Sequence, residues 1–260
     1  MKKTDIEQVK EIIANSGNNF HCTVLDRLKE KGWTVLISPY YNDNVSDKPR
    51  EIDLIAEKAF DIKRSDGKLI GTDTVNVKLF IECKYIPQKI VLWFHDKDRV
   101  KAEHLVLKIT PLQKNNIYTK DHHYLRDDSV AKLFADEKKQ KTENEIFYKA
   151  LNQSLNSMVY YRGSESIIPK NRESIKFKLD YPVIICNDFN NLYRVDIGSS
   201  DEPVIINDNF QLEVNYAYLD LSKKHSNEYF LIDIVSYGKI DAFLEDLQKD
   251  VNIVIFIKDF

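Results

Sequence analysis

Two apolar segments of the chain are each interrupted by charged residues. Asp53 lies within REIDLIAEK, while Glu82 and Lys84 lie within LFIECKYI. Alternate side chains of a strand share a face, so Glu82 and Lys84 point one way and Cys83 the other. Charges inside an apolar strand are costly to bury without partners. We therefore expect a hairpin that places Asp53 beside Glu82 and gathers two carboxylates and a lysine at one end of a sheet.

This set of groups suits chemistry assisted by a metal ion. Two carboxylates together with water oxygens are a typical environment for Mg²⁺, which keeps several waters and takes few protein ligands. Lys84 would lie beside the bound water, where it could orient the water or help to deprotonate it. A lysine amine suits that role because crowding by neighbouring charge shifts its pKa readily.

The hydrophobic pattern predicts the elements that must position these residues. A capping box of Thr4 and Glu7 opens a first helix that ends at Gly17. Residues 57–74 are expected to form a hairpin that turns at Asp66–Gly67. The elements around the charged segments are a helix at 18–31, strands at 33–38, 51–56 and 77–86, a helical region at 127–163 and a strand at 181–186.

The rest of the chain extends this α/β pattern. A strand is expected at 89–94, followed by a solvated charged stretch at 95–103. The later pattern predicts strands at 192–196, 212–221, 228–235 and 251–257, with a helix at 240–249. The chain contains no internal repeat and no linker rich in Pro, Gly or Ser. We therefore expect one domain over 1–260, with a core at 18–187 and a β-rich extension at 188–260.

Composition excludes several classes of protein. The 260 residues carry a net charge of −3, which excludes a histone-like or polybasic binder, and 43% hydrophobic residues exclude a disordered chain. Three widely spaced cysteines form no CxxC pair and are expected to be reduced thiols. The sequence shows no signal peptide and no run of eighteen apolar residues. These features predict a soluble cytoplasmic protein with no membrane partner.

The pattern Asp53 … Glu82-Cys83-Lys84 resembles the PD-(D/E)XK nuclease superfamily. The sequence EIDLIA followed by FIECKY is similar to sequences in the Mrr-like and resolvase-like branches of that superfamily. The expected order of elements also resembles that superfamily's core of helix, three-stranded meander, helix and strand, over about the first 190 residues. The resemblance implies a restriction-endonuclease-like mixed sheet flanked by helices.

The resemblance also implies roles for these residues. Asp53 and Glu82 would ligate Mg²⁺, with Mn²⁺ as a substitute, the backbone carbonyl of Cys83 would complete the set of ligands, and Lys84 would be catalytic. The implied reaction is hydrolysis of a phosphodiester, in which the metal polarises the phosphate, lowers the pKa of the attacking water and stabilises the growing negative charge.

The sequence departs from the family pattern at several positions. Pro49 is not adjacent to Asp53, and Glu51 is a candidate auxiliary acid. Many relatives carry a Glu early in the first core helix, where this chain has His21. His21 could ligate a metal or position a phosphate, but the missing oxygen ligand puts a second metal site in doubt. Gln153 stands where relatives often carry a Gln on the second helix.

Three functions are compatible with these features. The first is a metal-dependent endonuclease that acts on DNA, with restriction or anti-phage defence and a homodimer or larger defence complex implied by resemblance. The second is a catalytically weak nuclease-fold module that binds nucleic acid or a partner protein, and it predicts binding that survives chelation. The third is a nuclease that acts on RNA, which nothing in the sequence separates from the first.

Other polar groups are expected to have structural or surface roles. The adjacent pair His122–His123 is expected at the surface, and Asp233 is expected to have a structural role near a sheet end. Tyr40–Tyr41 and Trp93–Phe94 could stack on bases but are expected to pack in the structure. A solvated loop is expected for His95, Asp96, Asp98 and His104, and a charged surface, open to phosphate contacts, for Lys97, Arg99, Lys101, Lys108 and Lys114.

Overall fold

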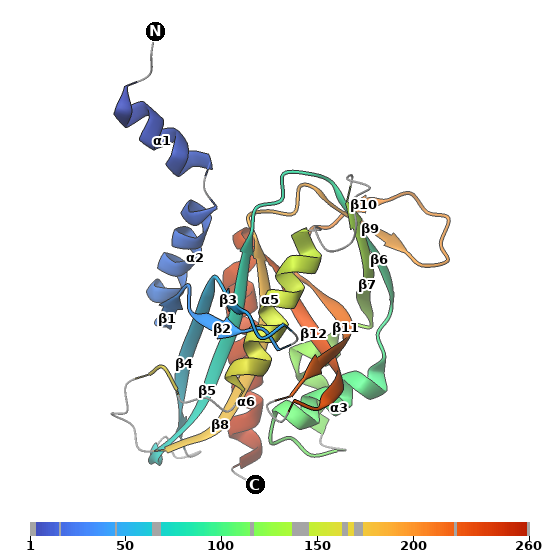
Figure 1. The fold of residues 1–260 in the computed structure, drawn as a ribbon. Coiled ribbons are helices and arrows are strands. Elements are labelled where there is room, and N and C mark those ends of the chain that lie inside the picture. The colour runs from blue at the N-terminus through green and yellow to red at the C-terminus, as the bar shows by residue number, and fades with distance from the viewer. Residues whose placement is uncertain are drawn as a thin grey trace.

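One large mixed sheet flanked by helices forms the body of the molecule (Figure 1). This arrangement confirms the predicted α/β class. The turn predicted at Asp66–Gly67 lies outside the residues that can be described. The computed structural model describes residues 4–15, 17–44, 46–63, 69–114, 117–136, 146–162, 166–168, 174–220 and 223–258.

Within the described residues, ten strands form this sheet and two more form a separate ribbon. The ribbon pairs β2 (Tyr40–Asn42) with β3 (Pro49–Glu51). In their order across the sheet, the ten strands are β1 (Thr34–Ile37), β4 (Leu54–Lys63), β5 (Leu69–Lys84), β8 (Ser174–Cys186), β12 (His225–Ser236), β11 (Phe210–Leu219), β7 (Ser129–Asp136), β6 (Ile90–Asp96), β9 (Leu192–Asp196) and β10 (Val204–Ile205).

The register of the first strands brings the charged segments to one end of the sheet. Strands β1, β4 and β5 form an antiparallel meander in which Leu54 lies opposite Ile81. Strand β8 runs parallel to β5, with Cys186 opposite Lys84. Because β4 begins where β5 ends, the residues just before Leu54 meet the last residues of β5.

Helices cover both faces of the sheet. Helix α5 packs on one face, and α2, α3 and α6 pack on the other, so the core has two apolar clusters separated by the sheet (Figure 1). None of the described helices is long and apolar enough to cross a membrane. The helices are α1 (Asp5–Asn15), α2 (Asn18–Glu30), α3 (Arg99–Ile109), α4 (His123–Arg126), α5 (Ile146–Tyr161) and α6 (Ile240–Lys258).

The two N-terminal helices follow the sequence signals closely. The backbone N–H of Thr4 donates to Glu7 Oε2 at 2.8 Å and that of Glu7 donates to Thr4 Oγ1 at 3.3 Å, which confirms the capping box of α1. Helix α2 ends where Gly32 adopts a φ of +79°, a left-handed conformation that favours glycine. Val24 and Leu28 bury one face of α2 against the sheet.

Two predicted elements were wrong in type. Residues 129–136 form strand β7 instead of a helix, because they pair with β6 over almost its whole length. Residues 251–257 continue α6 instead of forming a strand. Leu247, Val251 and Val254 recur at helical spacing and are all buried, so helical periodicity outweighs the strand propensity of this β-branched run.

The stretch predicted to be solvated at 95–103 is partly buried. Lys97 is buried and its Nζ donates to the carbonyl oxygen of Tyr124 and to Gln211 Oε1, both at 2.8 Å. Burial lowers the pKa of Lys97 to about 8. Asp98 caps α3 by accepting a hydrogen bond from the N–H of Lys101. The prediction failed here because Lys97 finds its partners on elements distant in sequence.

His122 and His123 are buried, so their predicted surface location was wrong. His123 lies between two carboxylates: its Nδ1 contacts Asp250, and its Nε2 lies 3.2 Å from Asp233 Oδ2. Burial alone would lower the pKa of His123, but Asp250 and Asp233 outweigh it and raise that pKa to about 10. Paired charges therefore join helices α4 and α6 to strand β12 of the sheet.

This cluster predicts a specific pH dependence of stability. The pKa of His123 is raised above its unfolded value of about 6.5, so its stabilising contribution is complete below that pH and is lost as the pH rises towards 10. We expect His123→Gln to lower the free energy of unfolding by about 3 kcal/mol near pH 6. Urea denaturation should show this deficit shrinking by pH 9.5. A deficit that is constant across pH would contradict the charged assignment of His123.

Candidate functional site

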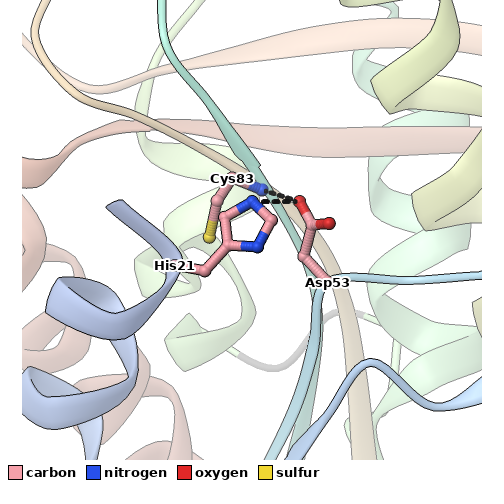
Figure 2. A group of neighbouring side chains, drawn as sticks. All are labelled: His21, Asp53 and Cys83. Carbon is pink, nitrogen blue, oxygen red and sulfur yellow. Dashed lines mark hydrogen bonds and ion pairs between the residues drawn. The ribbon is translucent and has the colours of Figure 1, made fainter. Parts of the chain in front are cut away.

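Asp53 and the end of β5 are joined by a direct hydrogen bond. Asp53 lies in the bend between β3 and β4, and its Oδ2 accepts the backbone N–H of Cys83 at 2.8 Å (Figure 2). This bond holds the carboxylate across the strand end, where the antiparallel register has placed it. The predicted juxtaposition of the two charged segments is therefore present.

Lys84 connects the two carboxylates. Its Nζ lies 2.6 Å from Glu82 Oε2 and 3.7 Å from Asp53 Oδ2. Burial alone would lower the pKa of Lys84, but Glu82 and Asp53 outweigh it and raise that pKa, so Lys84 is a cation in this arrangement. The three residues expected to perform the chemistry thus form one cluster.

His21 reaches the same carboxylate from α2. Its Nε2 lies 3.2 Å from Asp53 Oδ2, and Figure 2 shows the imidazole and the Cys83 amide meeting the same oxygen. His21, whose position many members of the resembled superfamily fill with Glu, therefore contacts the first predicted metal ligand. Its position fixes the orientation of Asp53 from the face of the sheet that α2 covers.

Glu82 is fully buried and incompletely paired. Burial raises the pKa of Glu82 to about 8, the charge of Asp53 adds to this effect, and Lys84 opposes it. Lys84 occupies Oε2, whereas Oε1 is buried and has no hydrogen-bond partner among the described residues. A buried carboxylate oxygen without a partner is costly, so Oε1 is the atom at which this cluster is incomplete.

Gln153 contacts the backbone of Glu51, two residues before Asp53. Gln153 Nε2 donates to the carbonyl oxygen of Glu51 at 2.9 Å, while Gln153 Oε1 is buried without a partner in the described structure. The predicted strand at 51–56 is interrupted, because β3 ends at Glu51 and β4 begins at Leu54, so Glu51 and Asp53 do not lie on one strand. The role of Glu51 as an auxiliary acid stays a prediction.

Tyr41 was predicted to pack and is indeed buried, but it also borders the site. Its hydroxyl has no hydrogen-bond partner in the described part of the chain. Burial raises the pKa of Tyr41, and the charge of Glu82 adds to this effect, which places the phenol near that carboxylate. No spacing in the sequence indicates this proximity, because it depends on how the β2–β3 ribbon folds over the sheet.

The donor set fits a hard, oxygen-binding cation. The carboxylates of Asp53 and Glu82 are oxygen donors of the kind that Mg²⁺ prefers, and Glu82 Oε1 is available. His21 N, Asp53 O and Cys83 Sγ also lie within 4.8 Å of one another, a set that would suit a softer metal. Burial raises the pKa of the Cys83 thiol, which opposes formation of the thiolate that a softer metal would bind.

A second group, His122, His123 and Asp250, has ligand atoms equally close together. Its hydrogen bonds oppose metal binding. The backbone N–H of Tyr124 donates to His122 Nδ1 at 3.2 Å, so Nδ1 is an acceptor and Nε2 carries the proton of the neutral ring. That protonated Nε2 faces Asp250 and cannot bind a metal.

Of the other candidates from the sequence, His95, Asp96 and His104 are exposed, as expected for solvated groups. Lys97 is buried and is therefore not part of the predicted basic surface.

Comparison of the chain with protein families, with curated proteins and with solved structures finds no match.

The buried carboxylate predicts a gain in stability on its removal. Because the pKa of Glu82 is raised above its unfolded value, stability is lost as the pH rises through about 8. We expect Glu82→Gln to raise the free energy of unfolding at pH 9 by about 1 to 3 kcal/mol, with a smaller effect at pH 4.5, where the folded-state carboxyl is protonated. Chemical denaturation at the two pH values measures this. A variant less stable than wild type at pH 9 would show that the ionised carboxylate is well accommodated.

Proposed function

We propose that the chain is a Mg²⁺-dependent endonuclease that hydrolyses phosphodiester bonds in DNA, built on a restriction-endonuclease-like core of the PD-(D/E)XK type. The observation that carries the proposal is the buried, unpartnered Glu82 Oε1 beside Asp53 and Lys84. A site that retains such a costly group at neutral pH is characteristic of functional chemistry.

The order of elements supports the proposed core. Helix α2, the β1–β4–β5 meander, helix α5 and the parallel strand β8 occur along the chain in the order expected for that core. The chain departs from it by inserting β6, α3, α4 and β7 between β5 and α5. The inserted strands and those after Cys186 extend the same sheet instead of forming a separate unit.

Asp53 and Glu82 would hold the cation through carboxylate oxygens. When bound, Mg²⁺ supplies Lewis-acid polarisation of the phosphate and activation of water. Lys84, a cation held by both carboxylates, orients groups at the reaction centre and offers positive charge to the developing phosphorane. His21 is a positioning residue because it acts through its contact with Asp53. Ligation by the Cys83 carbonyl stays a prediction.

A cleavage assay on supercoiled plasmid tests the proposal. We expect wild type to nick or linearise the plasmid with Mg²⁺ or Mn²⁺ and to stop when EDTA is added. Lys84→Ala should lose about 100-fold or more of the rate, because it removes a charge at the reaction centre. The matched control is Lys89→Ala, which removes an exposed lysine five residues along the chain.

Equal cutting by Lys84→Ala and wild type would refute the assignment. A second function, a binding module without turnover, is favoured by His21, because its contact occupies Asp53 Oδ2 where the family carries a further oxygen ligand. That function predicts nucleic-acid binding that persists in EDTA with no cleavage by any divalent metal. Action on RNA, a homodimer and a role in restriction or anti-phage defence rest on resemblance and stay predictions.

A further inference from the structure

The large sheet divides into two parts between β8 and β12. These two strands pair only where Val183–Cys186 meets Asp233–Ser236. Before that point β8 stays paired with β5, and β12 stays paired with β11 (Figure 1). The two halves of the sheet therefore separate towards one end and leave a wedge that side chains from both faces must fill.

A cavity of about 170 Å³ occupies this wedge. It is lined from α3 on one face of the sheet, from α5 on the other, and from both diverging strands. Its apolar wall includes Tyr124, Met158 and Phe230. An apolar cavity of about 150 Å³ accommodates one benzene ring, so this volume suits one six-membered ring, such as the ring that carries the Watson–Crick edge of a base.

The polar side of the cavity contains one acid that is paired and one that is not. Glu228 forms an ion pair with Lys108. It also accepts hydrogen bonds from Arg162 Nη1 at 2.9 Å and from the Tyr218 hydroxyl at 2.7 Å. Asp180 also lines the cavity, but its carboxylate has no hydrogen bond or ion pair within the described structure. Burial raises the pKa of Asp180, and the nearby cations Lys78, Arg162 and Lys178 offset this only in part.

We propose that this cavity binds the Watson–Crick edge of a guanine base, with Asp180 accepting its two adjacent N–H donors. A carboxylate offers two parallel acceptors, and it is satisfied best by two neighbouring donors on one planar edge. Among the common bases only guanine presents N1–H beside an exocyclic amine. Adenine and cytosine present an acceptor beside their amine, which would face the carboxylate unfavourably.

The remaining lining is compatible with this ligand. The aromatic and thioether side chains of Tyr124, Phe230 and Met158 suit the faces of a planar ring. Three cationic and two acidic side chains line the cavity. The cationic side chains are hydrogen-bond donors and suit the carbonyl oxygen next to guanine N1. The proposal does not depend on cleavage at the Asp53–Glu82 cluster.

Calorimetric titration of the full chain with guanosine and with inosine tests the proposal. Inosine lacks only the exocyclic amine, so we expect it to bind at least about tenfold more weakly than guanosine, the effect of one lost charge-assisted hydrogen bond. Asp180→Asn should weaken guanosine binding by at least about tenfold, because the amide replaces one of the two acceptor oxygens with an NH₂ donor that would face a guanine N–H. Asp128→Asn, an exposed acid outside this cavity, should have no effect.

Chemical-shift mapping of wild type with guanosine removes any dependence on a variant that fails to fold. The proposal expects the largest amide shifts at residues 178–181 and 228–231. A single-stranded oligonucleotide with one guanine, run beside guanosine, distinguishes a base presented by nucleic acid from a free nucleoside. Absence of binding by both, equal binding of guanosine and inosine, or shifts elsewhere would overturn the proposal.

Discussion

Burial of the Glu82 carboxylate at the end of β5 constrains the surrounding structure. A charge in that position requires a compensating cation, and Lys84 supplies it two residues along the same strand. Lys84 in turn draws Asp53 towards the strand end, where the Cys83 amide and His21 fix it. Even so, one oxygen of Glu82 has no protein partner in the described residues. The local architecture is therefore arranged around a carboxylate that the protein alone does not satisfy.

The two buried charged clusters on opposite faces of the sheet differ in completeness. Glu82 shares the face of Phe80, which α5 covers, whereas Asp233 shares the face of Leu231 and Val235, which α6 covers. On the α6 face, both nitrogens of His123 contact carboxylates and every group has a partner, as expected for a structural cluster. On the α5 face, the unpaired oxygen remains. This difference separates a stabilising cluster from a candidate site for chemistry.

The sequence predicted the features that depend on neighbours along the chain. The meeting of Asp53 with Glu82 and Lys84 follows from strand alternation and one antiparallel register, which are local rules. The burial of His122 and His123 could not be predicted, because Asp250 lies 127 residues from His123 in sequence. Strand β7 was missed for the same reason, since its pairing depends on β6. The length of α6 was readable from the spacing of Leu247, Val251 and Val254, but strand propensity was given more weight.

Calorimetric titration with Mg²⁺ tests most directly whether the Asp53–Glu82 pair is a cation site. The account predicts that wild type binds Mg²⁺ and that Asp53→Asn and Glu82→Gln each abolish binding. His123→Gln, which alters the cluster on the other face, should leave Mg²⁺ binding intact. No heat of binding with wild type, or binding that persists in both carboxylate variants, would contradict the account.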